Sequence, residues 1–161
     1  MNINDVVNKI KKDTNCIVSK EEGLPKLQNN HILPDDLTKF YQLCGGISLF
    51  KGSEYEMNIL PPGKFLLANP IIVGELCEDD ISSEWYTICE DSDGNFITID
   101  LNKNRIGKCY DSFWDRHGVV GECSIIANSF LELLDKLYKN KGTSLFWLDD
   151  DFKYIGDAYD E

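Results

Sequence analysis

Residues 91–95, Asp-Ser-Asp-Gly-Asn, have the side chains of a calcium-binding loop, because carboxylates and an amide surround a glycine. In an EF-hand that glycine is the sixth of twelve positions, so the first ligand here would be Cys89 and the twelfth Asp100. A thiol in the first position and an Asp in place of the bidentate Glu do not fit that site. Asp93-Gly94 between two alternating apolar runs instead predicts a β-hairpin, because both residues tolerate a positive φ.

The six cysteines do not have the spacing of a zinc site. Zinc ligands usually come in pairs two to four residues apart, whereas the closest cysteines, Cys77 and Cys89, are twelve positions apart. His31 and His117 add no ligand pair. Residues 1–5 have neither the basic nor the apolar region of an export signal, so we expect a cytoplasmic chain with reduced thiols. The sequence predicts no metal and no cofactor.

Nucleophilic catalysis requires a Ser or Cys beside a base and an orienting group. His117 lies in the polar run 114–118 without a nucleophile motif, so we predict a surface turn there. Cys44 lies on the apolar face of a predicted helix, which favours a core thiol over a reactive one. Carboxylate pairs are too abundant to single out a glycosidase pair, and Gly45-Gly46 follows a helix, the reverse of the order in a phosphate loop. No catalytic residues are predicted.

Charge is the most distinctive compositional feature, with 28 acidic against 16 basic residues and a net charge of −12. Residues 75–100 contain nine acids and no Lys or Arg, and residues 145–161 contain six acids and one Lys. Nucleic acids and anionic membranes attract proteins mainly through Lys and Arg, so neither is expected as a partner. Acidic segments suit a basic protein partner, although acid also serves solubility alone.

Three stretches have the apolar spacing of amphipathic helices: residues 3–10, 34–44 and 129–138. Pro34 suits the first turn of the second helix, and we predict that Gly45 closes that helix in the left-handed conformation. Ser129 and Glu132 form a capping box at the start of the third helix, and Gly142 ends it.

Between the second and third helices the pattern changes to short β-type runs separated by turn residues. These runs predict six strands, over residues 47–50, 55–60, 71–76, 85–90, 95–101 and 106–110. Strands flanked by helices, without βαβ alternation, indicate an α+β fold with a mainly antiparallel sheet. We expect one domain over residues 1–144 and an aromatic, acidic tail over residues 145–161 that docks on it. No run approaches the roughly 20 apolar residues of a membrane helix.

Residues 32–46, Ile-Leu-Pro-Asp-Asp-Leu-Thr-Lys-Phe-Tyr-Gln-Leu-Cys-Gly-Gly, resemble the signature of the SUKH superfamily, named in part for the yeast Smi and Knr regulators of cell-wall synthesis. Its pattern is a Leu-Pro pair, a helix with an aromatic pair and a closing glycine. Residues 85–100 and 129–138 resemble two further family segments in the same order, so the resemblance covers about residues 5–140. This chain departs from the family at Gly23 and Pro25, which interrupt the preceding helix, and in its acidic tail.

The resemblance implies an α+β fold without catalytic residues and a role as a protein-binding module. Many bacterial members are immunity proteins that neutralise toxins, often nucleases. It also implies a structural role for the motif residues Leu33, Pro34, Phe40, Gly45, Gly46 and Trp85.

The favoured hypothesis is therefore an immunity protein that binds a basic toxin, with nucleases as one candidate class. A regulatory or scaffold protein unrelated to toxins is an alternative, and a small-ligand-binding protein or enzyme is a third. The residues predicted to bind the partner are the acids of the two acidic segments: Glu75, Glu78, Asp79, Asp80, Glu84, Asp91, Asp93, Asp149, Asp150 and Asp151.

Overall fold

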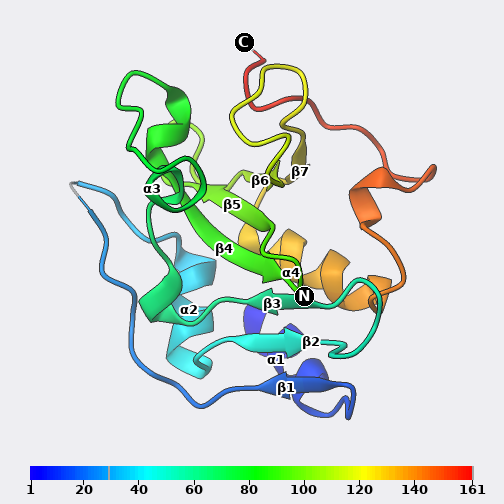
Figure 1. Cartoon of the computed structure of the whole chain (residues 1–161). Coiled ribbons are helices and arrows are strands. Elements are labelled where there is room, and N and C mark those ends of the chain that lie inside the picture. Colours follow the sequence, from blue (N-terminus) through cyan, green and yellow to red (C-terminus); the bar gives the residue numbers. More distant parts are fainter. Residues whose placement is uncertain (29, 161) are drawn as a thin grey trace.

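A seven-stranded antiparallel sheet forms the centre of the computed structural model, which describes residues 1–28 and 30–160 (Figure 1). The strands lie in the sheet in the same order as in the chain, so every connection joins neighbours. They are β1 Cys16–Val18, β2 Ile47–Leu49, β3 Met57–Ile59, β4 Trp85–Asp91, β5 Phe96–Asp100, β6 Cys109–Ser112 and β7 Ile125–Ala127.

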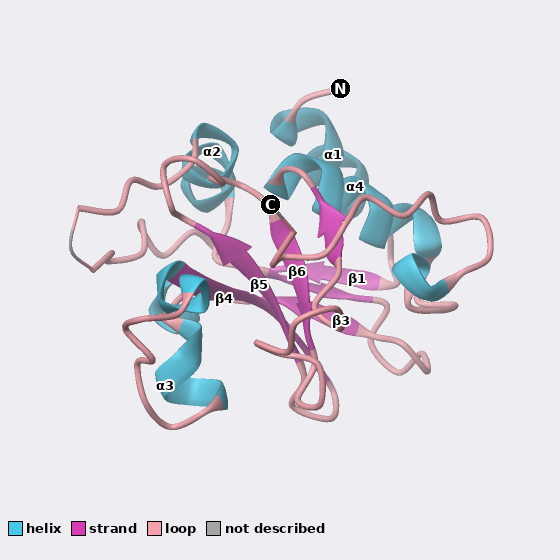
Figure 2. Ribbon diagram, turned by 90° about the horizontal axis from the view of Figure 1, so that it is seen from above, coloured by secondary structure: helices cyan, strands magenta, loops and turns pink. Residues whose placement is uncertain are grey.

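Helices cover both faces of this sheet (Figure 2). Three lie on one face: α1 Ile3–Lys11, α2 Asp35–Leu43 and α4 Phe130–Asn140. The short α3 Ala68–Ile72 lies on the other face, and three 3-10 turns complete the helices: η1 Pro62–Lys64, η2 Ile81–Glu84 and η3 Phe146–Leu148. None of the helices in the described chain is long and apolar enough to cross a membrane.

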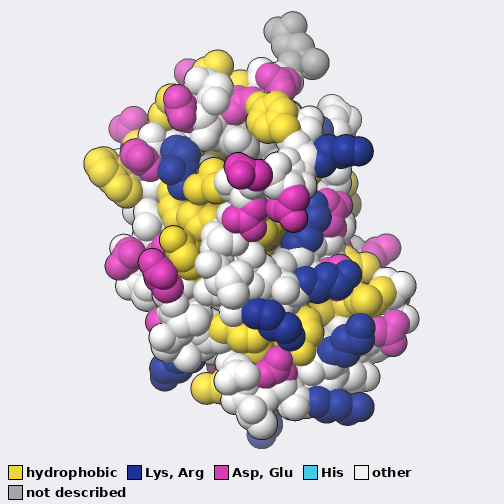
Figure 3. Space-filling view, turned by 90° about the vertical axis from the view of Figure 1, so that its right-hand side faces the viewer, with side chains coloured by type: hydrophobic (Ala, Val, Ile, Leu, Met, Phe, Trp, Pro, Cys, Tyr) yellow, Lys and Arg dark blue, Asp and Glu magenta, His cyan; other side chains and the backbone are white. Residues whose placement is uncertain are grey.

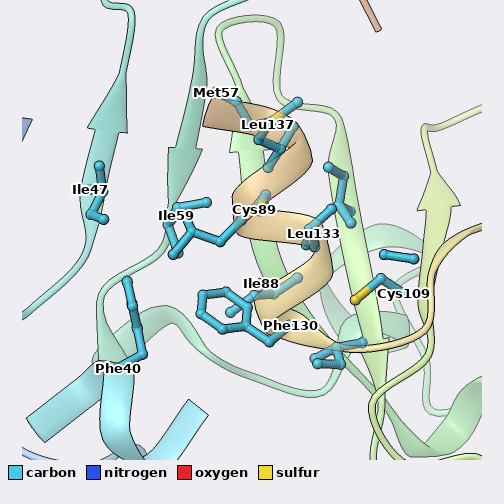
Figure 4. Close-up of a cluster of buried hydrophobic side chains, with 14 of the residues drawn as sticks. Phe40, Ile47, Met57, Ile59, Ile88, Cys89, Cys109, Phe130, Leu133 and Leu137 are labelled. Carbon is cyan, nitrogen blue, oxygen red and sulfur yellow. The ribbon is translucent and has the colours of Figure 1, made fainter. Parts of the chain in front are cut away.

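The main hydrophobic core lies between the sheet and the three-helix layer (Figure 4). Phe130 and Leu133 of α4 are fully buried, and the Phe130 ring contacts Phe40 of α2 edge to face, with 4.8 Å between ring centroids. Full burial of such a side chain contributes about 1.5–3 kcal/mol. A register shift between Thr87 and Cys89 lets β4 place both Ile88 and Cys89 in this core.

A second, smaller core lies on the opposite face of the sheet. Trp85 of β4 and Tyr110 of β6 are buried with their ring centroids 4.2 Å apart, and Ala68 of α3, Cys123 and Ala158 pack around them. The C-terminal segment thus contributes to this core. Trp85 reaches it because β4 alternates its side chains between the two faces of the sheet.

The predicted α+β class and antiparallel sheet are confirmed, as are the three amphipathic helices. The Asp93-Gly94 hairpin between β4 and β5 is also confirmed, and Cys44 is buried. The strand predicted over residues 71–76 is wrong, since residues 68–72 form α3. Pro70 fits the first turn of α3, and the Asn69 amide donates to the Leu76 carbonyl (3.0 Å), which folds the following residues back against the helix.

Strands β1 and β7 were not predicted, and β6 begins later in the chain than predicted. β1 and β7 each have three residues and lie outside the predicted runs, whereas the equally short β2 and β3 fall within runs predicted over residues 47–50 and 55–60. β6 begins at Cys109 because Gly107, with φ of 92°, forms a turn inside the run predicted over residues 106–110. The sheet therefore has seven strands where six were expected.

The prediction that Gly45 closes α2 in the left-handed conformation is wrong. Cys44 leaves the helix in an extended conformation, and Gly46 has the positive φ, 117°. Gly45 lies where a Cβ atom would collide with the Lys20 carbonyl. The two glycines instead allow close pairing with Ser19, whose N–H donates to the Gly46 carbonyl at 2.9 Å.

Candidate partner-binding surface

The predicted partner-binding acids of the first acidic segment lie on both sides of β4. Glu84 directly precedes this strand and Asp91 ends it, and seven residues at about 3.3 Å each separate the two by roughly 20 Å. The acidic segment 75–93 is therefore divided between two places on the molecule.

The first place is a groove of about 830 Å³, which we call the large groove. Four of the predicted acids line it: Glu78, Asp79, Asp80 and Glu84. Apolar side chains from three segments also line it, including Ile32, Leu76 and Ile106. The remaining wall contains the basic side chains of His31, Lys103 and Arg105.

One acid of the large groove, Glu84, has basic partners. The Glu84 carboxylate accepts a hydrogen bond from the Asn102 amide at 2.6 Å and lies 3.6 Å from an Arg105 nitrogen and 3.5 Å from His31 Nε2. Arg105 Nε also donates to the buried carboxylate of Asp100 at 2.8 Å. Glu84 is thus held inside the protein's own network.

Asp80 is also an internal acceptor. Its carboxylate caps η2 by accepting from the Ser82 N–H (3.0 Å), and it accepts from the Tyr159 hydroxyl of the C-terminal segment at 2.7 Å. Burial opposes ionisation of Asp80, but the hydrogen bonds from Ser82 and Tyr159 outweigh it and lower the pKa. This acid joins η2 to the end of the chain.

His117 does not lie in a surface turn as predicted. It is 8% exposed, and its ring meets Trp85 edge on. Nε2 lies 2.6 Å from Asn69 Oδ1, and the Asn69 amide nitrogen donates to Ser82 Oγ and to the Leu76 carbonyl. Asn69 Oδ1 must therefore accept, so the neutral imidazole carries its proton on Nε2.

Burial lowers the pKa of His117 to about 4, with Asp80 opposing the shift. The hydrogen-bond partner of His117 is an amide and not a nucleophile.

The second place is a hollow of about 240 Å³ beside the β4–β5 hairpin, which we call the hairpin hollow. Nine residues line it: Glu54, Tyr55, Glu56, Asp91, Ser92, Asp93, Asn95, Phe113 and Leu145. Four of them are acids and none is Lys or Arg. Asp91 shapes the turn, because its carboxylate accepts from the N–H groups of Asp93 (3.0 Å) and Asn95 (2.8 Å).

Glu54 and Glu56 were missed by the sequence reasoning, which concentrated on residues 75–100. They enter the hairpin hollow because β3 pairs with β4 so that Met57 lies opposite Asp91. A prediction of the pairing between β3 and β4 would have placed both residues beside Asp91.

Two buried Asp–Arg pairs hold the elements that carry these surfaces. Asp111 forms an ion pair with Arg116, whose Nε lies 2.7 Å from the carboxylate, and accepts a hydrogen bond from the Trp147 indole at 2.9 Å, beside the hairpin hollow. Asp100 accepts from Arg105 and from the Trp85 indole (3.1 Å), beside the large groove. Buried carboxylates with these partners are fixed in position.

The acids of the tail follow η3. Asp149 accepts from the Ser144 hydroxyl at 2.8 Å, whereas Asp150 and Asp151 are exposed. Leu145, just before η3, lines the hairpin hollow, so the tail starts beside the second acidic cluster. Glu161, the last acid of the tail, lies outside the described residues.

The ten predicted acids thus form two sets. Asp80, Glu84, Asp91 and Asp149 are half-buried and accept internal hydrogen bonds. The other six are exposed: Glu75, Glu78, Asp79, Asp93, Asp150 and Asp151. Among residues 1–28 and 30–160, no three His, Cys, Asp or Glu side chains converge as a metal site would require.

The six motif residues lie around α2 and the start of β4. Phe40 and Trp85 are fully buried, Leu33 packs against the main core, and Pro34 directly precedes α2. Gly45 and Gly46 make the close approach described above.

Comparison with known proteins gives two matches. The model of the SMI1 / KNR4 family (SUKH-1) matches residues 26–136. The immunity protein YokJ of Bacillus subtilis (strain 168) is 51% identical over 160 residues, which cover 99% of this chain and 97% of YokJ. The comparison with solved structures found no match. The chain therefore belongs to the SMI1/KNR4 (SUKH-1) family.

Proposed function

We propose that this protein is a cytoplasmic, non-catalytic immunity protein that neutralises a toxin by binding it. The observation that carries the proposal is the 51% identity to an immunity protein along nearly the whole of both chains. The buried hydrogen bonding of His117 supports a non-catalytic role, because the one well-buried imidazole is engaged with an amide.

The charge of the chain supports a basic toxin as the partner. The net charge is −12, and six of the predicted acids are exposed and free to face another protein. Opposite charge speeds diffusional encounter and disfavours acidic competitors. A nuclease fits this description, because an enzyme that holds a phosphate backbone presents Lys and Arg around its active site.

Co-expression tests this proposal. Toxin domains from the source strain are expressed one at a time in a sensitive host, with this chain or with an unrelated acidic protein of similar size. The proposal predicts that this chain restores growth against one toxin domain and that the two purified proteins form a complex. Death of the host with every toxin domain, despite soluble expression of the chain, would contradict it.

A further inference from the structure

We propose that Trp114 and the hairpin hollow form the surface that contacts the toxin. Trp114 enters an apolar pocket of the toxin, and a Lys or Arg at the rim of that pocket enters the hairpin hollow. This inference rests on the proposed immunity function and names the surface that performs it. It places the contact at one end of β4 and leaves the large groove outside it.

Trp114 is the most exposed large apolar side chain of the described residues. It is 80% exposed, whereas Trp85 is 0% and Trp147 is 6% exposed. A large aromatic ring in water is the unusual case for a folded protein, and Trp is the residue type most enriched at the energetic centres of interfaces.

The loop that carries Trp114 is firmly held. The preceding Phe113 is 8% exposed and packs edge to face on Trp147, with 5.8 Å between centroids. The Arg116 guanidinium lies 5.0 Å from the Phe113 centroid and binds Asp111. The backbone N–H of Trp114 donates to the Asn95 side chain at 3.2 Å. An aromatic side chain on a held backbone loses little conformational freedom on binding.

This contact with Asn95 places Trp114 next to the hairpin hollow, which Asn95 and Phe113 both line. The four acids of the hollow have no salt bridge with any described Lys or Arg, whereas Asp115 beside Trp114 lies 3.9 Å from an Arg116 nitrogen. In the large groove, by contrast, Glu84 has two basic neighbours, and Lys103 also lies in the lining. Negative charge without a basic partner therefore lies in the hollow beside the exposed indole.

The side of the molecule with the loop before β3 and with η3 faces the viewer in Figure 3. Acidic side chains there flank an area of exposed hydrophobic side chains, and basic side chains lie beside it and in the lower half of the view.

The size of the hollow favours a protein side chain as its occupant. About 240 Å³ is below the roughly 300–1,000 Å³ typical of small-molecule pockets, but it suits one extended Arg or Lys. An Arg entering it would meet carboxylates able to form bidentate hydrogen bonds. A second copy of this chain would instead bring two acidic clusters together, which like-charge repulsion disfavours.

The test compares Trp114→Ala with Ile32→Ala, a matched variant at a residue that is 73% exposed and lines the large groove. The probe is the purified toxin domain that the wild-type chain neutralises in co-expression, and the Kd is measured for each variant. We expect Trp114→Ala to weaken binding by about 30-fold or more, the loss typical of a hot-spot residue, and Ile32→Ala by less than about threefold. Trp114→Phe should recover part of the loss.

Unfolding midpoints close to wild type for both variants would show that the losses concern binding. Equal Kd values for wild type and Trp114→Ala, or a larger loss in Ile32→Ala, would overturn the inference and leave the immunity function standing. A dimer of the chain that Trp114→Ala dissociates would assign the surface to self-association and also overturn it. If the wild-type chain neither neutralises nor binds any toxin domain, the inference and the proposed function are both overturned.

Discussion

The Trp147 indole donates a hydrogen bond of 2.9 Å to the Asp111 carboxylate, joining the segment after the last helix to β6. Arg116 binds the same carboxylate at 2.7 Å, and Asp111 is 1% exposed. Burial raises the pKa of Asp111, and Arg116 with the hydrogen bonds opposes that rise. The loop that presents Trp114 and the tail thus share one buried anchor.

Asp111→Ala should destabilise the fold by about 3 kcal/mol, because it leaves the Arg116 guanidinium without its buried partner. Urea unfolding measures this change, and the exposed Asp151→Asn, expected to change stability by less than about 0.5 kcal/mol, is the control. A loss below about 1 kcal/mol in Asp111→Ala would mean that this anchor does not hold the loop and tail together.

His117 should make stability fall in mild acid. Its pKa is about 4 in the folded protein and about 6.5 in the unfolded chain, so only the unfolded state takes up a proton between these values. Stability from this residue is complete above pH 6.5 and declines as the pH falls toward 4, by about 3 kcal/mol in total. Urea unfolding at pH 7 and pH 4.5 should show this loss in wild type and a smaller one in His117→Gln. Equal losses in both proteins would refute the assignment.

Gly46→Ala should destabilise the protein by about 1–3 kcal/mol. Gly46 has φ of 117°, and a Cβ there would lie 2.7 Å from the Ile59 carbonyl oxygen. Gly63→Ala is the matched control, since that position has no left-handed φ and no atom within 4 Å of the added Cβ. The difference in the free energy of unfolding is the measurement, and comparable values for the two variants would contradict the structural role assigned to the diglycine turn.

Charge at the hairpin hollow should control the rate of toxin association. We expect Glu54→Gln/Asp93→Asn to slow association at low salt, with little effect at high salt, because screening removes long-range attraction. The control is Glu78→Gln/Asp79→Asn, the same charge change at the large groove, which should slow association less. Stopped-flow association at two ionic strengths decides between them, and the reverse order would move the interface to the large groove.

Much of the fold was predictable because its signals are local. The amphipathic spacing of residues 3–10 and 129–138 gives helices in the structure, and Asp93-Gly94 gives the hairpin. The prediction of a strand over 71–76 failed because residues 68–72 form a short helix, and the Asn69 amide holds the following residues against it by donating to the Leu76 carbonyl. The run of apolar residues does not reveal this side-chain contact.

The candidate surface was less predictable. The strand predicted over residues 85–90 already separates Glu84 from Asp91. Treating the acids of residues 75–93 as one segment left that separation out. The meeting of Glu54 with Asp93 depends on the β3–β4 register. The exposure of Trp114 depends on how Phe113 and Arg116 pack, which the run 114–118 alone does not encode.

Neutralisation of a toxin by direct binding can be measured by titrating the activity of the purified toxin domain with the purified chain. We expect the activity to fall in proportion to the added chain and to be abolished once every toxin molecule is bound, with an unrelated acidic protein giving no inhibition. Full toxin activity in a large excess of the chain would contradict this expectation.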